Sequence, residues 1–296
     1  MRHKEPRFSI VIPCYNEGKY LSETLESIKD QDFSGDLEVI VVDNNCTDNT
    51  VDIAKEYGAK IITEPNPGVC WARQAGTEAA TGEIIVSTDA DTRFSRSWLS
   101  KIDKTFRSGD YVAVSGPCMY SDGPWWGKFY PKFLFGAVDL VKRILGYPFY
   151  VTATNIAFRK SAWSGYDTFQ TQGGDELSLL HSLREKGMVA FDNDNPVYTS
   201  GRRLYRGLFY NVFVSFFIHY LMAYYVNKLF HRTVIGTAPA YRTVEPRSSW
   251  ATLFRATAAA SLILLIATMH LPGHDTILQQ AHETVARVEK IIRLHA

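Results

Sequence analysis

The sequence has no excess of charge of either sign and no paired cysteine motif, and each absence excludes a class of protein. Its 296 residues carry a formal net charge of +1, so no long-range field favours binding to nucleic acid. Four cysteines are present, with no Cys-x-x-Cys pair and no histidine at metal-ligand spacing: Cys14, Cys46, Cys70 and Cys118. We therefore expect free thiols in a reducing compartment, and no nucleic-acid partner.

The N-terminus also lacks the pattern of a secretory signal. Residues 1–7 are polar and charged, and the apolar run at residues 8–12 is too short for the hydrophobic part of a signal peptide. There is no internal repeat and no low-complexity tract. A hydrophobic content of 46% and a charged content of 21% describe an ordinary folded protein with one large domain, or one domain and an appendage. We expect the chain to remain in the cytoplasm.

Residues 84–92 are the stretch around which the rest of the pattern is arranged. They begin as an apolar run typical of a buried parallel strand and lead into Asp89 and Asp91. In extended backbone, residues two apart point to the same side, so both carboxylates would project from the carboxyl end of a strand, where open α/β sheets bind ligands. Two hard oxygen ligands suit Mg²⁺ or Mn²⁺, and such a cation suits phosphates. Taken alone, the pattern also fits two solvated aspartates in a loop.

Strand and helix patterns alternate along the first two-thirds of the chain. Strands are predicted at residues 8–12, 37–42, 60–62, 84–87, 111–114, 155–160 and 189–191. Helical patterns fall between most of them, which predicts an α/β fold with a mostly parallel sheet and right-handed crossovers. Residues 117–149 are rich in aromatics, glycine and proline. They are expected to form either a mobile region over a pocket or a surface subdomain packed on the sheet.

Several segments together resemble family 2 glycosyltransferases. The segments that carry the resemblance are residues 10–17 (IVIPCYNE), 41–50 (VVDNNCTDNT), 66–68 (NPG) followed by Ala72, Arg73 and Gly76, 87–91 (STDAD), 155–160 (NIAFRK) and 174–176 (GDE). Their order and spacing agree over residues 8–206. The resemblance implies the GT-A fold, a mostly parallel mixed sheet flanked by helices, over residues 1–206. Residues 207–296 are then expected to be a helical, membrane-associated extension.

The resemblance also implies the activity and the donor side of the site. It implies a UDP- or GDP-sugar donor, a divalent cation (Mn²⁺ or Mg²⁺) and inversion at the anomeric carbon. The residues expected to contact the nucleotide sugar are Pro13, Tyr15, Glu17, Asp43, Arg73, Asp89, Arg202 and Arg203. Asp89 and Asp91 match the family's DxD metal motif. Asp43 would accept a hydrogen bond from the base. Asp91 is expected to bind the metal directly, with Asp89 as a second ligand or facing the ribose or a metal-bound water.

The acidic pair Asp175–Glu176 stands where the family has its catalytic base. Inverting transfer needs one base that takes the proton of the acceptor hydroxyl. The family order is Glu-Asp, whereas this chain has Asp-Glu. Counting back from Gly187 without a gap aligns Glu176 with the family's aspartate, and one inserted residue would align Asp175 instead. Both stay open, with Asp175 slightly favoured, and helix capping is the structural alternative for either carboxylate.

Two arginines near residue 200 and the absence of one family motif also bear on the resemblance. Arg202 and Arg203 would hold the diphosphate from a loop, or they form a solvated basic turn. The Gln-x-x-Arg-Trp motif of processive synthases is absent.

The C-terminal third contains two apolar runs. Residues 208–227 carry no formal charge and include eight aromatic residues. The length fits a membrane span, but polar interruptions and interfacial aromatics favour a helix that lies on a membrane surface or packs on the catalytic domain. A second run covers residues 256–271, and residues 276–296 have an amphipathic pattern. We expect the chain at the inner face of the cell membrane, attached peripherally or through its C-terminal segments.

Three functions are compatible with these patterns. The first is an inverting glycosyltransferase that moves one sugar to a glycan or lipid-linked acceptor. The second is a sugar-nucleotidyltransferase, but this would need a Gly-rich basic loop, and residues 13–18 have a single glycine and an acid. The third is an inactive scaffold that binds nucleotide sugars. The simultaneous presence of Asp91, Asp175 and Glu176 favours the first.

Overall fold

The computed structural model describes residues 6–168, 175–223, 226–227 and 235. The chain divides into two units, Met1–Val244 and Glu245–Ala296, and only the first contains described residues. The apolar run at residues 256–271 and the amphipathic pattern at residues 276–296 lie outside the described residues. A domain boundary at residue 206 stays a prediction.

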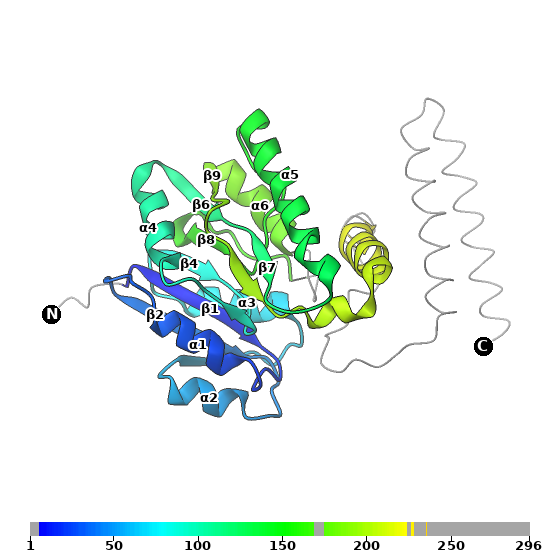
Figure 1. The fold of residues 1–296 in the computed structure, drawn as a ribbon. Coiled ribbons are helices and arrows are strands. Elements are labelled where there is room, and N and C mark those ends of the chain that lie inside the picture. Colours follow the sequence, from blue (N-terminus) through cyan, green and yellow to red (C-terminus); the bar gives the residue numbers. More distant parts are fainter. Residues whose placement is uncertain (1–5, 169–174, 224–225, 228–234, 236–296) are drawn as a thin grey trace, which may run out of the picture. The chain divides into compact units, whose positions relative to one another are not determined.

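A seven-stranded mixed sheet forms the centre of the first unit (Figure 1). Its strands, in spatial order, are β3 (Lys60–Thr63), β2 (Leu37–Asp43), β1 (Phe8–Cys14), β4 (Ile84–Ser87), β8 (Ile156–Arg159), β6 (Tyr111–Ser115) and β9 (Met188–Phe191). Strand β8 is antiparallel to both of its neighbours, and the other described pairings in this sheet are parallel. The predicted mostly parallel α/β sheet is confirmed.

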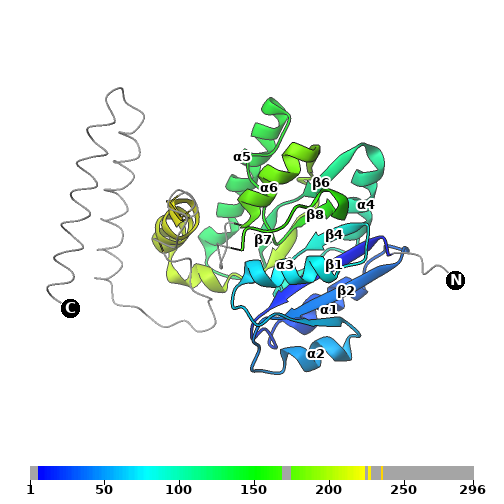
Figure 2. The same cartoon turned by 180° about the vertical axis from the view of Figure 1, so that it is seen from behind.

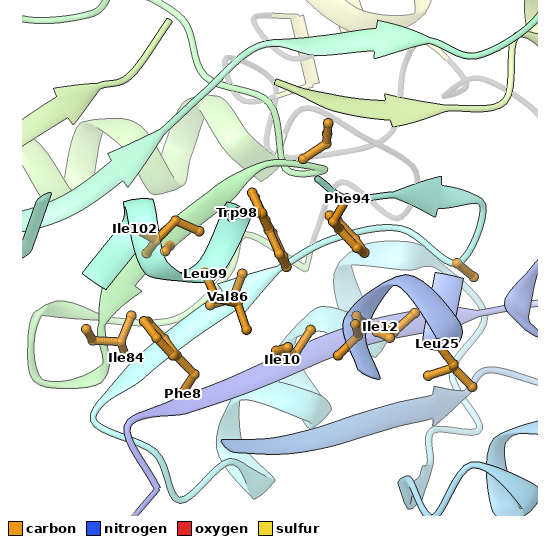
Figure 3. Packing of buried hydrophobic residues seen from close by; sticks show 14 of the residues in the cluster. Phe8, Ile10, Ile12, Leu25, Ile84, Val86, Phe94, Trp98, Leu99 and Ile102 are labelled. Atoms are coloured by element: carbon orange, nitrogen blue, oxygen red, sulfur yellow. The ribbon is translucent and has the colours of Figure 1, made fainter. Parts of the chain in front are cut away.

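Helices cover both faces of the sheet because its strands are apolar on both sides. They are α1 (Leu21–Lys29), α2 (Thr50–Glu56), α3 (Val69–Ala79), α4 (Trp98–Ser108), α5 (Tyr130–Leu145) and α6 (Asp175–Lys186). Side chains alternate along β1: Phe8 and Ile10 pack with residues of α1 and α4, whereas Val11 belongs to the opposite cluster with residues of α3 and α6. Figure 3 shows the first cluster, in which Trp98 is fully buried.

Gly76 allows α3 to lie close to the sheet. A Cβ atom there would stand 2.5 Å from Val11 Cγ1 and 2.8 Å from Val42 Cγ2. Gly76→Ala should therefore lower the free energy of unfolding by about 1–3 kcal/mol through overpacking, measured by chemical denaturation. Gly136→Ala is the matched control, since nothing lies within 4 Å of its Cβ. It should stabilise helix α5 slightly, and equal losses in both variants would contradict the packing argument.

The aromatic region at residues 117–149 is a packed part of the domain. It contains β7 (Cys118–Tyr120), the 3₁₀ turn η1 (Trp125–Lys128) and helix α5. Strand β7 belongs to a second sheet with the order β5 (Thr92–Arg93), β10 (Val197–Thr199), β7. Phe135 and Val138 of α5 are buried together with Phe191 of β9. Of the two expectations for residues 117–149, the structure shows the second, a subdomain packed on the sheet.

The chain continues from β10 into η3 (Arg202–Arg206) and the π-helix η4 (Tyr210–Met222). The described part of the predicted 208–227 stretch is thus largely η4, which has 13 residues. Within the described ranges, no helix combines the length and apolar character that crossing a membrane requires.

Candidate active site

The candidate residues gather at the carboxyl ends of three adjacent parallel strands, β2, β1 and β4. Pro13 lies near the end of β1, and Tyr15 follows in the next loop with its side chain exposed. Asp43 is the last residue of β2. Asp89 and Asp91 follow the end of β4. The sequence therefore predicted correctly which edge of the sheet carries these side chains.

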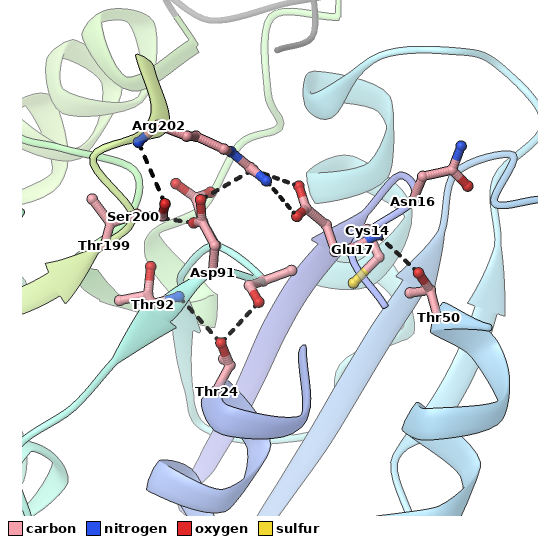
Figure 4. Close-up of polar contacts among 12 residues, drawn as sticks. Cys14, Asn16, Glu17, Thr24, Thr50, Asp91, Thr92, Thr199, Ser200 and Arg202 are labelled. Carbon is pink, nitrogen blue, oxygen red and sulfur yellow. Dashed lines mark hydrogen bonds and ion pairs between the residues drawn. The ribbon is translucent and has the colours of Figure 1, made fainter. Parts of the chain in front are cut away.

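Hydrogen bonds join the loop after β1 to the loop after β2. Asn16 has a left-handed φ of 54°, and its Oδ1 accepts a hydrogen bond of 2.7 Å from the backbone of Thr47. The backbone N–H of Glu17 donates to Thr50 Oγ1 at 2.8 Å, at the start of α2 (Figure 4). Polar residues in these two loops thus hold each other in place before any ligand binds.

The residues after β2 extend this network to the third loop. Asp43 Oδ1 accepts a hydrogen bond of 2.8 Å from the backbone of Cys46. Buried Asn44 donates to the carbonyl of Asn66 at 2.7 Å and accepts from the N–H of Gly68 at 2.8 Å. Gly68 has φ 140°, a conformation that favours glycine. The Asn-Asn and Asn-Pro-Gly segments therefore contribute loop geometry.

Arg73, on α3, connects the carboxylates after β4 with the start of α6. Its buried guanidinium is 2.8 Å from Asp89 Oδ1 through Nη2 and 2.9 Å from Asp175 Oδ2 through Nη1. Thr154 donates to the other oxygen of Asp89 at 2.6 Å. Burial would raise the pKa of Asp89, but the charge of Arg73 and the Thr154 bond hold it below its usual value. Asp89 is therefore an ionised carboxylate with both oxygens engaged.

Asp91 faces a different cation. Thr199 donates to its Oδ1 at 2.9 Å, and Arg202 Nη2 lies 3.0 Å from its Oδ2. Arg202 also forms a two-pronged pair with Glu17, at 2.9 Å and 2.7 Å (Figure 4). Burial raises the pKa of Asp91 to about 6 against the opposing charge of Arg202, and the nearby carboxylates of Asp89 and Glu17 add to the rise.

The turn that carries Asp91 is held by hydrogen bonds to Thr24 of α1. Thr24 Oγ1 donates to the carbonyl of Ala90 at 2.8 Å and accepts from the N–H of Thr92 at 3.1 Å (Figure 4). This pair of hydrogen bonds fixes the backbone on both sides of Asp91. The side chain of Asp91 therefore has a defined direction.

Asp175 and Glu176 are the first residues of α6. Asp175 is fully buried and takes the Arg73 contact, whereas Glu176 retains slight exposure. The pKa of Glu176 is raised to about 8, because burial and the negative charge of Asp175 raise it by more than Arg73 lowers it. The two neighbours thus differ in chemistry: one is an ion-paired carboxylate, and the other is a carboxyl group that gains and loses a proton near neutral pH.

The capacity of the site for metal rests on few protein ligands. Among the residues described, no group of three or more His, Cys, Asp or Glu side chains could hold an ion. Asp91 pairs with Arg202, which is 21% exposed, whereas Asp89 pairs with Arg73, which is 6% exposed. Mg²⁺ and Mn²⁺ are often bound by one or two carboxylates together with substrate phosphates and water. The donor set fits that mode of binding.

The structure brings together most of the residues named from the sequence, and adds three threonines. The charged residues form two sets of ion pairs. Arg73 pairs with Asp89 and Asp175. Arg202 pairs with Glu17 and Asp91. The side chain of Arg203 is exposed, and its charge acts on Asp89. No local sequence pattern predicts the contacts made by Thr24, Thr154 and Thr199, because each is an isolated hydroxyl far along the chain from its partner.

Comparisons with known proteins agree with this geometry. The sequence profile described as Glycosyl transferase family 2 matches residues 9–166. An uncharacterized glycosyltransferase of Nostoc sp. is 34% identical over 114 residues, covering 36% of this chain and 35% of that protein. The Staphylococcus aureus poly(ribitol-phosphate) beta-N-acetylglucosaminyltransferase TarS is 32% identical over 100 residues, covering 31% of this chain and 18% of TarS. The matches therefore span about a third or less of these relatives' lengths.

Solved structures share the fold. The mannosyltransferase PcManGT from Pyrobaculum calidifontis, in complex with GDP-Man and Mn²⁺, matches with a TM-score of 0.60 and 21% identity over 95% of this chain and 81% of that one. S. aureus TarS 1–349 in complex with UDP-GlcNAc matches with a TM-score of 0.52 and 20% identity, over 66% of this chain and 58% of that one. At these identities the similarity concerns the GT-A-like fold alone.

Proposed function

Because the chain belongs to glycosyl transferase family 2, we propose that it moves one sugar from a nucleotide diphosphate sugar to an acceptor hydroxyl, with inversion at the anomeric carbon. The observation that carries this proposal is the bridge formed by Arg73. It joins Asp89, beside the candidate metal ligand, to Asp175, beside the candidate base. Arg73 thus holds the neighbour of the proposed metal ligand and the neighbour of the proposed base, and a single displacement at a sugar carbon requires a donor site next to a proton acceptor.

The donor would lie over the joined loops at the ends of β1 and β2. Pro13 and Tyr15 would border the base and ribose, and Asp43 would accept a hydrogen bond from the base. Arg202 and Arg203 would hold the diphosphate, because planar guanidinium groups match phosphate oxygens in pairs. Solved relatives of the same fold are complexes with UDP-GlcNAc and GDP-Man, which supports a UDP- or GDP-sugar as donor.

A divalent cation, Mn²⁺ or Mg²⁺, would be held by Asp91. When bound, such a cation neutralises charge on the diphosphate that leaves. Asp89 would orient the ribose or a metal-bound water, since Arg73 and Thr154 already engage its two oxygens. The presence of Mn²⁺ in the complex of PcManGT supports this choice of metal.

Glu176 is the base that we propose, although the sequence alone slightly favoured Asp175. The acceptor oxygen attacks the anomeric carbon, the bond to the diphosphate oxygen breaks, and the acceptor proton passes to the carboxylate of Glu176. Asp175 is fully buried, and its Oδ2 is already held by Arg73 at 2.9 Å. Glu176 retains slight exposure, and burial and the charge of Asp175 raise its pKa to about 8. A general base works best when its pKa lies near the operating pH.

The acceptor that we propose is a glycan or a lipid-linked glycan at the cytoplasmic face of the membrane. Support comes from the uncharged, aromatic-rich stretch at residues 208–227 and the basic Arg203 and Arg206 that precede it. Phe209 and Phe213 in this stretch are exposed. Basic residues beside interfacial aromatics suit anionic head groups.

Incubation with a panel of UDP- and GDP-sugars and Mn²⁺ or Mg²⁺ should release free nucleoside diphosphate when a suitable acceptor is added. Membrane lipid extract and soluble glycans are tested as acceptors, with EDTA as the control. Pyrophosphate exchange would indicate a sugar-nucleotidyltransferase instead. Donor binding by calorimetry without turnover on any acceptor would indicate a scaffold. The observation that contradicts the proposal most directly is the absence of any donor binding in the presence of metal.

A further inference from the structure

Helix α5 presents large apolar side chains to solvent along one face. The exposed positions on this face follow one another at spacings of four, three, four and four residues: Phe129, Phe133, Gly136, Leu140 and Ile144. These spacings place them in one line along a helix. We call this line, together with Trp125 of η1, the α5 stripe. Trp125, Phe133 and Ile144 are 76%, 83% and 71% exposed.

The other side of the helix is already used for packing. Phe135 and Val138 are buried against Phe191 of β9, so the domain core needs no further apolar surface from α5. A helix that is apolar on two sides normally has a second partner on the outer side. Scattered exposed apolar residues are ordinary, but a contiguous line of aromatic and aliphatic side chains marks an interaction surface.

The charges next to the stripe are mainly positive. Lys128, Lys132 and Arg143 are exposed and lie along one border. The acid on this border, Asp139, is paired with Arg143 at 2.7 Å, and its side chain is largely covered. An apolar line bordered by cations is complementary to an anionic lipid surface, where rings enter the boundary region and basic groups meet the head groups.

The same surface continues towards the stretch at residues 208–227. A Cβ on Gly127 of η1 would lie 2.4 Å from Leu204 Cδ1 of η3, so the beginning of the stripe is in contact with η3. Figures 1 and 2, seen from opposite sides, both place the start of α5 beside η3. Tyr205 and Phe209 are exposed there as well. The aromatic surface is thus broader than one helix.

We propose that the α5 stripe is a docking surface for an anionic lipid bilayer. The stripe lies on a projecting helix, not in a groove, and its basic border supplies the charge complementarity. The inference concerns membrane binding and stands whether or not the chain transfers sugars.

The position of α5 also links this surface to the candidate base. On its inner side, Phe135 contacts Tyr150, with ring centroids 6.2 Å apart. Burial and the charge of Glu176 both raise the pKa of Tyr150, so that ring lies close to the carboxyl group. If the proposed function holds, a membrane-bound acceptor would reach the site on the side of Glu176.

Vesicle flotation of the full chain tests the docking surface. The wild type should float with phosphatidylcholine vesicles that contain phosphatidylglycerol, and binding should fall in high salt and on pure phosphatidylcholine. In the double variant Phe133→Glu/Ile144→Glu, the partition coefficient onto anionic vesicles should fall by at least about tenfold for each residue changed. Each substitution removes an apolar group that would be buried in the bilayer and adds repulsion from the anionic head groups. Both side chains point into solvent, so the fold should be unchanged by circular dichroism.

Met188→Glu is the matched control, since Met188 is an exposed apolar side chain on β9 and is not part of the α5 stripe. It should float like the wild type. A wild type that stays unbound with anionic vesicles overturns the proposal, as does a double variant that floats as well as the control. A wild-type dimer that becomes monomeric in the double variant, without vesicle binding, would assign the stripe to a second copy of the chain. Donor binding by the wild type is measured in parallel by calorimetry. A wild type that binds no donor would count against the proposed function, but it would not change the conclusion from flotation.

Discussion

Glu176→Gln should lower kcat by about 10²- to 10⁴-fold while donor affinity is kept, because the variant cannot accept the proton of the acceptor hydroxyl. The measurement is steady-state kinetics on the best donor and acceptor, with donor binding by calorimetry. The wild-type rate should also rise as the pH passes through about 8, since Glu176 is active only when ionised and its pKa is raised to that value. The variant should lack this rise.

The matched control is Asp175→Asn, one residue earlier in the same helix. Asp175 is a partner of Arg73, so this variant should mainly change donor KM and thermal stability. A loss of kcat with donor affinity kept in Asp175→Asn, and near-normal kcat in Glu176→Gln, would exchange the two roles. Near-normal kcat in both variants would rule out this pair as the base.

Stability gives an independent check on the same carboxyl group. The pKa of Glu176 is higher in the folded chain than its ordinary value of 4.5, so the folded state binds more protons than the unfolded state between 4.5 and about 8. The wild type should therefore lose stability relative to Glu176→Gln as the pH rises through this range. A difference that does not change with pH would mean that Glu176 has the same pKa in the folded chain as in the unfolded chain.

Asp91→Asn should abolish metal-dependent donor binding and turnover while the protein stays folded. A carboxamide lacks the charge that a hard divalent cation needs, but its oxygen can still accept the hydrogen bond of Thr199. Calorimetry with a UDP- or GDP-sugar, with and without Mn²⁺, measures the effect. Asp52→Asn, at an exposed carboxylate on α2, is the control and should bind like the wild type. Metal-dependent donor binding that survives in Asp91→Asn would show that the ion is held elsewhere.

The central strands could be predicted because their apolar runs end abruptly in polar residues. The runs of β1, β2 and β4 stop at Asn16, Asp43 and Asp89, and each stop lies at the edge where ligands bind in parallel sheets. A strand that is buried on both faces needs a continuous apolar run, and right-handed crossovers through helices make these strands parallel, so that they end at the same edge. The position of these polar side chains at one edge of the sheet could therefore be predicted before the fold was known.

Helix α5 was not predicted, for a reason that lies in its outer face. The α5 stripe adds a second apolar side to the segment, which hides the single apolar face of an amphipathic helix. Its ends carry ordinary signals: Pro131 lies in the first turn, and Gly146 ends the helix with a φ of 82°. Those two residues, given more weight than composition, would have revealed it.

The partners within the site could not be predicted, because they depend on tertiary structure. Nothing near Thr154 or Thr199 in the sequence indicates that one will bind Asp89 and the other Asp91. Likewise, the sequence predicts that Arg73 contacts the donor, whereas in the structure it pairs with two carboxylates. Contacts between distant segments are settled by how the sheets pack, which local patterns do not encode.

The pair of Glu17 with Arg202 has a consequence for the order in which a new chain becomes active. The two residues are 185 positions apart. During synthesis, Glu17 leaves the ribosome early, and β1, β2 and β4 can pair while the later part of the domain is still missing. Arg202 and Thr199 arrive only after β10 has been made, so Asp91 acquires its two partners at the end of the process. If the proposed function holds, a nascent chain would carry the proposed nucleotide loops for most of its synthesis without a complete diphosphate site, and would begin to use donor only when the whole domain is present.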